Sequence, residues 1–379
     1  LTQKHIMNPT DFPSEDDVVS NDSSSSSCFA DIGFMFDSEQ PTKSETLVFQ
    51  RNTACCSFCG HEIRGSDDDG CGEQEEKSVR VTIDAVDDNP GAVQSGHYLW
   101  PAAPALAQHL VNAYTSSHPC PNCDEHSANV NTTAHVGGTT LSDNDGVCIV
   151  ELGAGCGLAS LAAIQIFDVK CAVLTDHDPG TLNRAVENHR ATIRELNRVE
   201  EDNRGRSCLK LSKNVAVVPV FFERLSWGDD ENAIQLIMQV NEYLEKSKSE
   251  ETRKSTDRKY VYDEAVEGNR LSLEEILGND FLSPLNTENM NWRGFDLVLG
   301  SDLIYCKEIV KPLFRTVARL LSKKTSGALM MMTQSFSYED DTENEINNIC
   351  LNLGLCRSII SCDLKEGGVR VQTFQFDCN

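Results

Sequence analysis

Several carboxylates and glycines in this sequence have a spacing that suits the binding of a nucleotide-like ligand. Glu151 is followed by Gly153, Gly155 and Gly157, and the acid Asp176 comes about twenty residues later. Glycine allows the backbone to turn sharply and to approach a ligand closely. An acid at the end of a second strand is suited to accept hydrogen bonds from ribose hydroxyls. The pattern therefore predicts a nucleotide half-site.

The segments around these residues have the composition of the elements that must position them. Residues 147–152 form a short apolar run rich in β-branched side chains, which is typical of a buried parallel strand. Residues 158–167 have helical composition, so the helix N-terminus would point at the ligand. A second strand over residues 171–175 leads into Asp176. Leu158 stands where a dinucleotide G-x-G-x-x-G pattern has glycine, so a tight strand-to-helix turn in another α/β domain remains an alternative.

Strand-like and helix-like segments alternate through the rest of the chain. Further strands are expected at residues 215–222, 295–300 and 328–333, and a terminal antiparallel pair at 355–361 and 369–376. Helices are expected at residues 102–114, 179–201, 310–321 and 339–353. Residues 46–50 and 78–85 are expected to pair as a small N-terminal hairpin. This order predicts an α/β fold with a Rossmann-like, doubly wound sheet of seven strands, interrupted by long polar inserts.

The composition also divides the chain into regions. Residues 1–43 are acidic and serine-rich and are expected to form a disordered tail. Residues 44–114 hold the hairpin and first helix, with an insert at 51–77, and residues 115–146 form a polar insert with cysteines. Residues 147–379 hold the ligand-binding domain, with another insert at 229–291. This insert is expected to begin with a helix at 233–244, followed by a solvated charge run at 245–258. The first residue, Leu1, leaves the true start of the protein open.

The overall composition limits the class of partner and the compartment. The formal net charge of -26 over 379 residues argues against a nucleic-acid backbone as the main partner. It fits either a basic protein partner or simply acidic, solvated loops. No apolar run approaches the ~18 residues of a membrane span, and residues 1–40 lack a secretion signal. Because several of the sixteen cysteines fall in predicted core strands and helices, we expect a reducing compartment, the cytoplasm and also the nucleus.

Four separated blocks together resemble one known family. They are GHYLWPAAPALAQHL at residues 96–110, VELGAGCGL at 150–158, LSWG at 225–228 and FDLVLGSDLIY at 295–305. In this order they resemble methyltransferase family 16, the seven-β-strand protein lysine methyltransferases. The similarity covers roughly residues 78–376, apart from the inserts. It implies S-adenosylmethionine as the cofactor and a protein as the substrate.

The resemblance assigns the cofactor contacts to the ends of the predicted strands and to two tryptophans. The implied residues are Trp100, Glu151, Gly153, Ala154, Gly155, Asp176, Trp227 and Ser301. Asp176 would hold the ribose hydroxyls, and Trp227 would lie near the adenine. The position of Ser301 is often alanine in the family. Without the matched context, either tryptophan would more often be a core residue.

The same resemblance places the catalytic residues in the block Asp302-Leu303-Ile304-Tyr305. Methyl transfer to an amine requires an aligned and unprotonated acceptor. Asp302 would orient the amine or assist its deprotonation, and Tyr305 would border the substrate channel. Alternatively, Asp302 caps a helix that begins near Lys307, and Tyr305 packs in the core.

Two cysteine pairs have the spacing of zinc ligands. Cys56 and Cys59 lie in the first insert, and Cys120 and Cys123 lie in the second. They could complete one structural zinc site if the two inserts meet in space. The alternative is free thiols in loops.

The leading prediction is a protein lysine N-methyltransferase. A basic partner such as a translation factor, a chaperone or a histone would suit the acidic charge. A protein arginine or histidine methyltransferase, a small-molecule methyltransferase and an inactive scaffold with the same fold remain alternatives.

Overall fold

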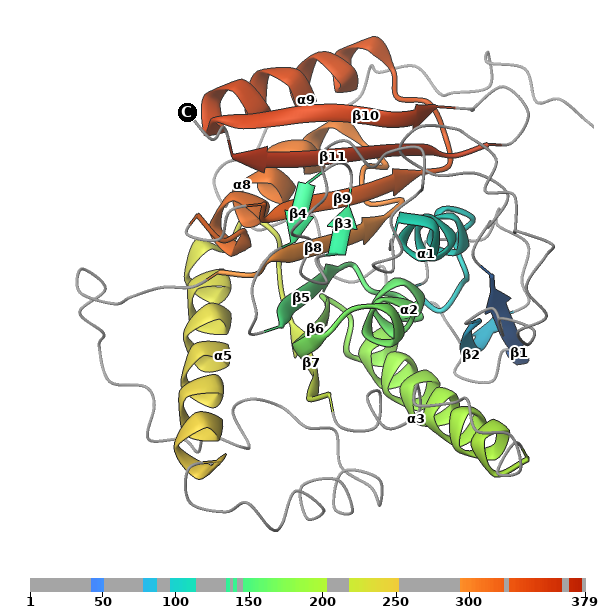
Figure 1. Cartoon of the computed structure of the whole chain (residues 1–379). Coiled ribbons are helices and arrows are strands. Elements are labelled where there is room, and N and C mark those ends of the chain that lie inside the picture. Colours follow the sequence, from blue (N-terminus) through green and yellow to red (C-terminus); the bar gives the residue numbers. More distant parts are fainter. Residues whose placement is uncertain are drawn as a thin grey trace, which may run out of the picture. The chain divides into compact units, whose positions relative to one another are not determined.

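A seven-stranded sheet lies at the centre of the computed structural model (Figure 1). Its strands in chain order are β5 (Val147–Leu152), β6 (Val169–Asp176), β7 (Val220–Arg224), β8 (Leu297–Ser301), β9 (Leu329–Gln334), β10 (Leu355–Cys362) and β11 (Arg370–Phe376). They are arranged in the order β10-β11-β9-β8-β5-β6-β7. The pairs from β9 to β7 are parallel, whereas β11 runs antiparallel to both β9 and β10. The predicted α/β fold with a Rossmann-like sheet is confirmed.

The structure describes ten separate segments of the chain. They are residues 42–50, 78–86, 96–113, 134–136, 139–141, 146–202, 218–251, 294–323, 327–362 and 368–376. Residues 1–41 of the tail predicted at 1–43 and most of the predicted inserts lie outside them, whereas Thr42 and Lys43 of that tail belong to a strand. The four cysteines predicted to bind zinc, Cys56, Cys59, Cys120 and Cys123, also lie outside them. Among the described residues, no group of three or more His, Cys, Asp or Glu side chains is arranged to hold a metal ion. No helix in these segments is both long enough and apolar enough to cross a membrane.

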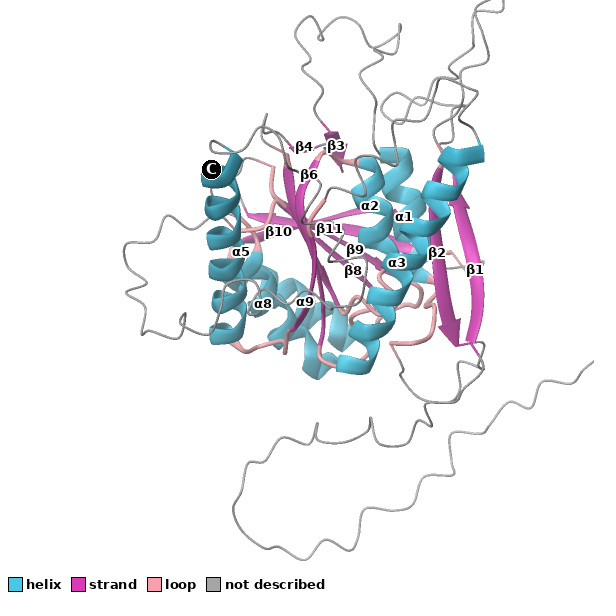
Figure 2. Ribbon diagram, turned by 90° about the horizontal axis from the view of Figure 1, so that it is seen from below, coloured by secondary structure: helices cyan, strands magenta, loops and turns pink. Residues whose placement is uncertain are grey.

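Helices cover both faces of the sheet (Figure 2). On one face lie α1 (Ala102–Ala113), α2 (Leu158–Ile166) and α3 (Pro179–Asp202), and on the other lie α5 (Asp230–Glu251), α8 (Val310–Leu320) and α9 (Asp340–Leu353). Strand β5 is buried along its whole length, and its side chains alternate between the two layers. Ile149 belongs to the core of the first layer, and Val150 to that of the second. Burial on both faces explains why the central strands are continuously apolar in sequence.

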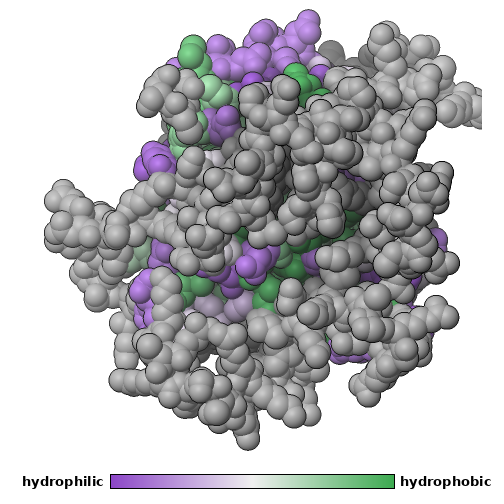
Figure 3. Space-filling model, in the orientation of Figure 1, coloured by the Kyte–Doolittle hydropathy of each residue, from purple (hydrophilic) through white to green (hydrophobic). Residues whose placement is uncertain are grey.

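Helix α9 buries one face in the core and exposes the other face to solvent. Its buried side chains include Ile346, Ile349 and Cys350. Its outer face, at the top of Figure 3, is mostly hydrophilic, although Leu351 is exposed there. This amphipathic pattern is what packs a surface helix onto a sheet.

The N-terminal hairpin is held by side chains of the helices. Strands β1 (Thr42–Phe49) and β2 (Val79–Val86) pair antiparallel. The other edge of β2 bonds to polar side chains of α2 and α3 instead of to a third strand. The bonds are Arg80 N to Gln165 Oε1 (3.1 Å), Gln165 Nε2 to Arg80 O (2.8 Å), Thr82 N to Thr192 Oγ1 (3.1 Å), Thr192 Oγ1 to Thr82 O (3.3 Å), Asp84 N to Asn188 Oδ1 (2.7 Å) and Arg184 Nη1 to Asp84 O (3.3 Å). The edge is thereby satisfied without further backbone pairing.

Two regions differ in detail from the sequence-based expectation. The insert at 229–291 begins with α5, which contains the helix expected at 233–244 and whose Leu236, Ile237 and Val240 are buried in the core. This helix also continues to Glu251, through residues expected to be a solvated charge run. Within the polar region at 115–146, a short antiparallel pair forms from β3 (Ala134–Val136) and β4 (Thr139–Leu141).

Candidate active site

The turn after β5 is built around three glycines with left-handed backbone angles. Gly153, Gly155 and Gly157 have φ of 55°, 53° and 79°, a region that other residues rarely adopt. A Cβ on Gly153 would lie 2.9 Å from Leu303 Cδ2 and 3.2 Å from Trp227 Cζ2. The turn therefore requires glycine for both its conformation and its close contacts.

Glu151 lies beneath this turn and is almost completely buried. Its Oε2 accepts a hydrogen bond from the backbone N–H of Ser160 at 3.0 Å, in the first turn of α2. Burial raises the pKa of the Glu151 carboxyl to about 7. The side chain thus joins the end of β5 to the start of α2 and supports the turn from below.

Asp176, at the end of β6, bonds to the backbone of the turn. Its Oδ2 accepts the Gly155 N–H at 3.3 Å, and its Oδ1 accepts the Asp178 N–H at 3.1 Å. His177 Nδ1 lies 3.3 Å from the same Oδ1, and this contact raises the pKa of the imidazole. The structure therefore brings together the predicted acid and the predicted glycine turn.

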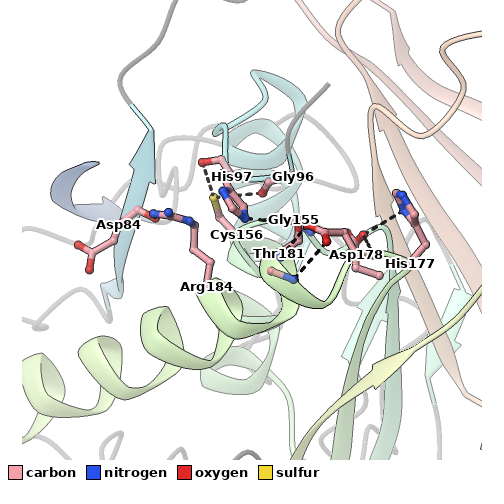
Figure 4. A network of polar contacts seen from close by, with 11 residues as sticks. Asp84, Gly96, His97, Gly155, Cys156, His177, Asp178, Thr181 and Arg184 are labelled. Carbon is pink, nitrogen blue, oxygen red and sulfur yellow. Dashed lines mark hydrogen bonds and ion pairs between the residues drawn. The ribbon is translucent and has the colours of Figure 1, made fainter. Parts of the chain in front are cut away.

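The segment before α1 lies against the other side of the turn (Figure 4). The Cys156 thiol lies within 3.6–3.9 Å of the carbonyl oxygens of Gly96, His97 and Tyr98. A Cβ on Gly155 would lie 3.2 Å from the Gly96 carbonyl oxygen. Trp100 follows in this segment, half-buried, with its ring edge-on to Tyr98 at a centroid distance of 5.5 Å.

Asp302, directly after β8, has a left-handed backbone conformation and a carboxylate that accepts several hydrogen bonds. Its φ of 51° is the only positive value at a non-glycine residue in the described segments. Oδ2 accepts the Ala102 N–H at 3.2 Å, and Oδ1 accepts the Ser335 N–H at 2.7 Å. The Ser335 hydroxyl lies 2.9 Å from both carboxylate oxygens. Burial raises the pKa of Asp302 despite these donors.

The alternative that Asp302 caps the helix beginning near Lys307 was wrong. The 3₁₀ helix η5 (Lys307–Ile309) is capped by Cys306 without a side-chain hydrogen bond, so Asp302 does not cap it. Instead, Asp302 binds the first N–H of α1, two hundred residues earlier in the chain.

Tyr305, Trp227 and Ser301 complete the set of predicted residues. Tyr305 is 51% exposed, so the alternative that it packs in the core is also wrong. Its pKa is raised by partial burial and by the nearby Cys306 and Asp176. Trp227 is half-buried against Gly153. Ser301 is the last residue of β8 and pairs in register with Thr333 of β9.

All these strand-end residues lie at the carboxyl edge of the parallel strands, where ligands bind in such sheets. Sequence reasoning missed Ser335 as a partner of Asp302. A signal was present, because Ser335 directly follows β9 just as Asp302 follows β8. Asn188, on α3, was also missed and lies behind the turn, where its Nδ2 donates to the Cys156 carbonyl oxygen at 2.9 Å.

Comparison with protein families identifies the group to which the chain is related. The sequence matches the family model described as lysine methyltransferase, methyltransferase family 16, over residues 81–201 and 264–348. These two ranges are more than half of the chain. The chain belongs to this family. The resemblance seen in the sequence blocks is thus confirmed.

Solved structures of other methyltransferases show distant similarity. A precorrin-6y C5,15-methyltransferase from Geobacter metallireducens is 10% identical, with a TM-score of 0.31 over 62% of this chain and 83% of that chain. The rRNA methyltransferase aviRa from Streptomyces viridochromogenes is 10% identical, with a TM-score of 0.33 over 62% and 78%. A ribosomal protein L11 methylase from Lactobacillus delbrueckii subsp. bulgaricus is 9% identical, with a TM-score of 0.29 over 61% and 69%. No functionally curated protein matches the sequence.

The family membership makes the protein an S-adenosylmethionine-dependent methyltransferase. The residues present fit this cofactor. The glycine turn is a backbone cradle whose contacts with Trp227 and Gly96 leave no room for side chains. The acid Asp176 lies within hydrogen-bond distance of that cradle. A buried acid, a half-buried aromatic ring and the half-buried glycines Gly153 and Gly155 suit a ligand with ribose, adenine and amino-acid parts.

Proposed function

We propose that this methyltransferase transfers a methyl group to the side-chain amine of a lysine in a protein substrate. The observation that carries the proposal is the fixed carboxylate of Asp302 at the strand edge, only three residues before the exposed ring of Tyr305. A carboxylate attracts a lysine ammonium group, and an exposed aromatic ring favours its aliphatic chain. The family description supports the same acceptor.

For the cofactor, we assign binding to the residues around the glycine turn. S-adenosylmethionine supplies the methyl group, carried on a sulfonium. Asp176 would accept hydrogen bonds from the ribose hydroxyls, while Gly153, Ala154 and Gly155 would present backbone to the methionine part. Trp227, Trp100 and Ser301 would border the pocket. Glu151 would act mainly by holding the turn, because its carboxyl is bonded to α2.

For the acceptor, we assign two tasks to Asp302. A lysine amine has an ordinary pKa near ~10.4 and must lose a proton before it can attack the methyl group. Asp302 would orient the amine and receive that proton at a carboxylate oxygen. Burial raises its pKa, which makes the carboxylate a better proton acceptor than an exposed aspartate. Tyr305 would border the path of the lysine side chain.

The identity of the partner and the compartment are further parts of the proposal. The net charge of -26 suits a basic protein substrate, such as a translation factor, a chaperone or a histone. Among the described residues, the buried cysteines Cys148, Cys156, Cys171 and Cys350 are not joined in disulfides, which supports a reducing compartment, the cytoplasm or the nucleus.

The experiment that tests the proposal uses the full chain with S-adenosylmethionine carrying a labelled methyl group. Labelled proteins from a cell extract are hydrolysed and their modified amino acids are identified. Methyl-lysine that disappears with Asp302→Asn supports the proposal. Label in methyl-arginine, in methyl-histidine or only in small molecules would contradict it. So would cofactor binding without any transfer, because that is the behaviour of a scaffold.

A further inference from the structure

We propose that Asn188 is a positioning residue that holds the glycine turn in the shape that binds the cofactor. The residue lies on α3, has no exposed surface and forms no part of the family pattern from which the site was predicted. The inference concerns cofactor binding alone and does not depend on the identity of the methyl acceptor.

Both the nitrogen and the oxygen of the Asn188 side-chain amide form hydrogen bonds. Its Nδ2 donates to the Cys156 carbonyl oxygen at 2.9 Å, and its Oδ1 accepts the Asp84 N–H at 2.7 Å. Both partners are main-chain groups, one in the glycine turn and one in β2. Because the amide is fully buried, water cannot replace either bond if the side chain is removed.

The bond to Cys156 fixes the part of the turn that a ligand would meet. Gly155 donates its N–H to Asp176, and Gly157 donates its N–H to Ala154. The carbonyl of Cys156 lies between these two anchored groups and has Asn188 as its side-chain partner. With neighbouring glycines free to rotate, this carbonyl is the point where the turn would change conformation most easily.

The bond to Asp84 closes a ring of contacts around the turn. Val86, at the end of β2, donates its N–H to the His97 carbonyl oxygen at 3.0 Å. The carbonyl oxygens of residues 96–98 in turn lie within 3.6–3.9 Å of the Cys156 thiol, and Figure 4 shows those of Gly96 and His97. These contacts link the hairpin, the segment before α1 and the turn. The Asn188 side chain forms hydrogen bonds to both β2 and the turn. Ordering of the turn by a ligand should accordingly stabilise the docking of the hairpin.

The test compares two substitutions one helical turn apart on α3. Asn188→Asp keeps the acceptor for Asp84 but removes the donor to Cys156. Thr192→Val is the matched control, since Thr192 is equally buried and bonds only to Thr82 of β2 at 3.1 and 3.3 Å. Calorimetric titration with S-adenosylmethionine should show a dissociation constant at least about tenfold higher for Asn188→Asp. Thr192→Val should lower the melting temperature but leave the dissociation constant within about twofold of wild type.

Two results would overturn the proposal: a folded Asn188→Asp protein with wild-type affinity, or an equal loss of affinity in Thr192→Val. If Asn188→Asp does not fold, amide hydrogen exchange of the unmodified protein decides. S-adenosylmethionine should then protect the Asp84 amide more than the Arg80 amide, which bonds to the remote Gln165. Equal protection of the two amides would refute the role of Asn188. No methyl acceptor is present in either measurement, so failure of the lysine assignment would leave the result unaffected.

Discussion

Asp302 connects three parts of the chain through a single carboxylate. It follows β8, accepts the first N–H of α1 and accepts both donors of Ser335 after β9. Its left-handed φ of 51° is a strained conformation for a residue with a side chain. Such strain persists where the surrounding structure fixes it, and here three separate donors do so.

Substitution of Asp302 should separate catalysis from cofactor binding. Asp302→Asn keeps the size of the side chain but turns an NH₂ group towards N–H donors and removes the charge. We expect the methyl-transfer rate to fall about a hundredfold or more, with S-adenosylmethionine affinity nearly unchanged. Rates with labelled cofactor and calorimetric titration measure the two effects. Ser335→Ala is the control, because it removes a hydroxyl but leaves the backbone donor to Asp302, and its rate should fall much less. Wild-type turnover in Asp302→Asn would contradict the catalytic assignment.

Glu151 should make the stability of the protein depend on pH. Its pKa is about 7 in the folded protein and 4.5 in an unfolded chain, so the folded state binds the extra proton between these values. The contribution to stability is therefore fully present below pH 4.5 and is lost as the pH rises to about 7. The loss is on the order of 3 kcal/mol in the free energy of unfolding.

Glu151→Gln isolates this effect, because its amide does not titrate. Denaturant unfolding of both proteins from pH 4.5 to 8 should show the wild type losing stability relative to the variant as the pH rises. Parallel pH profiles would show that the carboxyl does not titrate in this range.

The sequence identified the candidate site residues but not their partners in the structure. Asp302, Asp176 and Glu151 could be identified because each ends an apolar strand. The bonds from Ala102 and Ser335 could not, because they span 200 and 33 residues of sequence. The only structural partner that local reasoning offered, as an alternative, was the nearby helix. Asn188 gave no signal at all, since a polar residue on a helix is usually exposed to solvent.

At the scale of elements, the glycine turn offers a prediction with a matched control. Gly153→Ala must adopt a φ of 55° and place a methyl group 2.9 Å from Leu303 Cδ2. We expect a lower melting temperature and at least about tenfold weaker S-adenosylmethionine binding, because the turn must shift to relieve the contact. Gly354→Ala has a similar φ of 68°, but no atom lies within 4 Å of its new methyl group. It should lower the free energy of unfolding by about 1 kcal/mol without affecting cofactor binding. Equal cofactor affinity of the two variants would show that the turn does not form the pocket.

The elements themselves were largely predictable, with informative exceptions. Buried strands and amphipathic helices have strong periodic patterns, and these appeared close to their expected places. The end of α5 did not, because its last turns are charged and look like a solvated loop. A Glu242–Lys246 ion pair at 2.7 Å has the i, i+4 spacing that stabilises such a helix. The β3–β4 pair has only three residues in each strand, too few for a periodic signal.

At the scale of the whole molecule, the net charge of -26 should govern encounter with a substrate. If the substrate is basic, long-range attraction speeds association, and salt screens it over about 8–10 Å at physiological ionic strength. We expect kcat/KM for a lysine peptide with flanking arginines to fall as salt is raised. A peptide of the same length with neutral flanks is the control and should change much less. The same salt dependence for both peptides would rule out steering by charge.

The different rise per residue of a helix and a strand limits how many side chains of one helix can bond to the edge of β2. Four residues of an α-helix advance about 6.0 Å along its axis, whereas two residues of a strand advance about 6.6–6.8 Å. Asn188 and Thr192 therefore match Asp84 and Thr82, but each further step would add about 0.7 Å of mismatch. The next residue on this face of α3 is the apolar Leu196, and Arg80 bonds instead to Gln165 from α2. A single straight helix can thus hold only a short stretch of such a strand, and a longer hairpin would need another helix at a different offset.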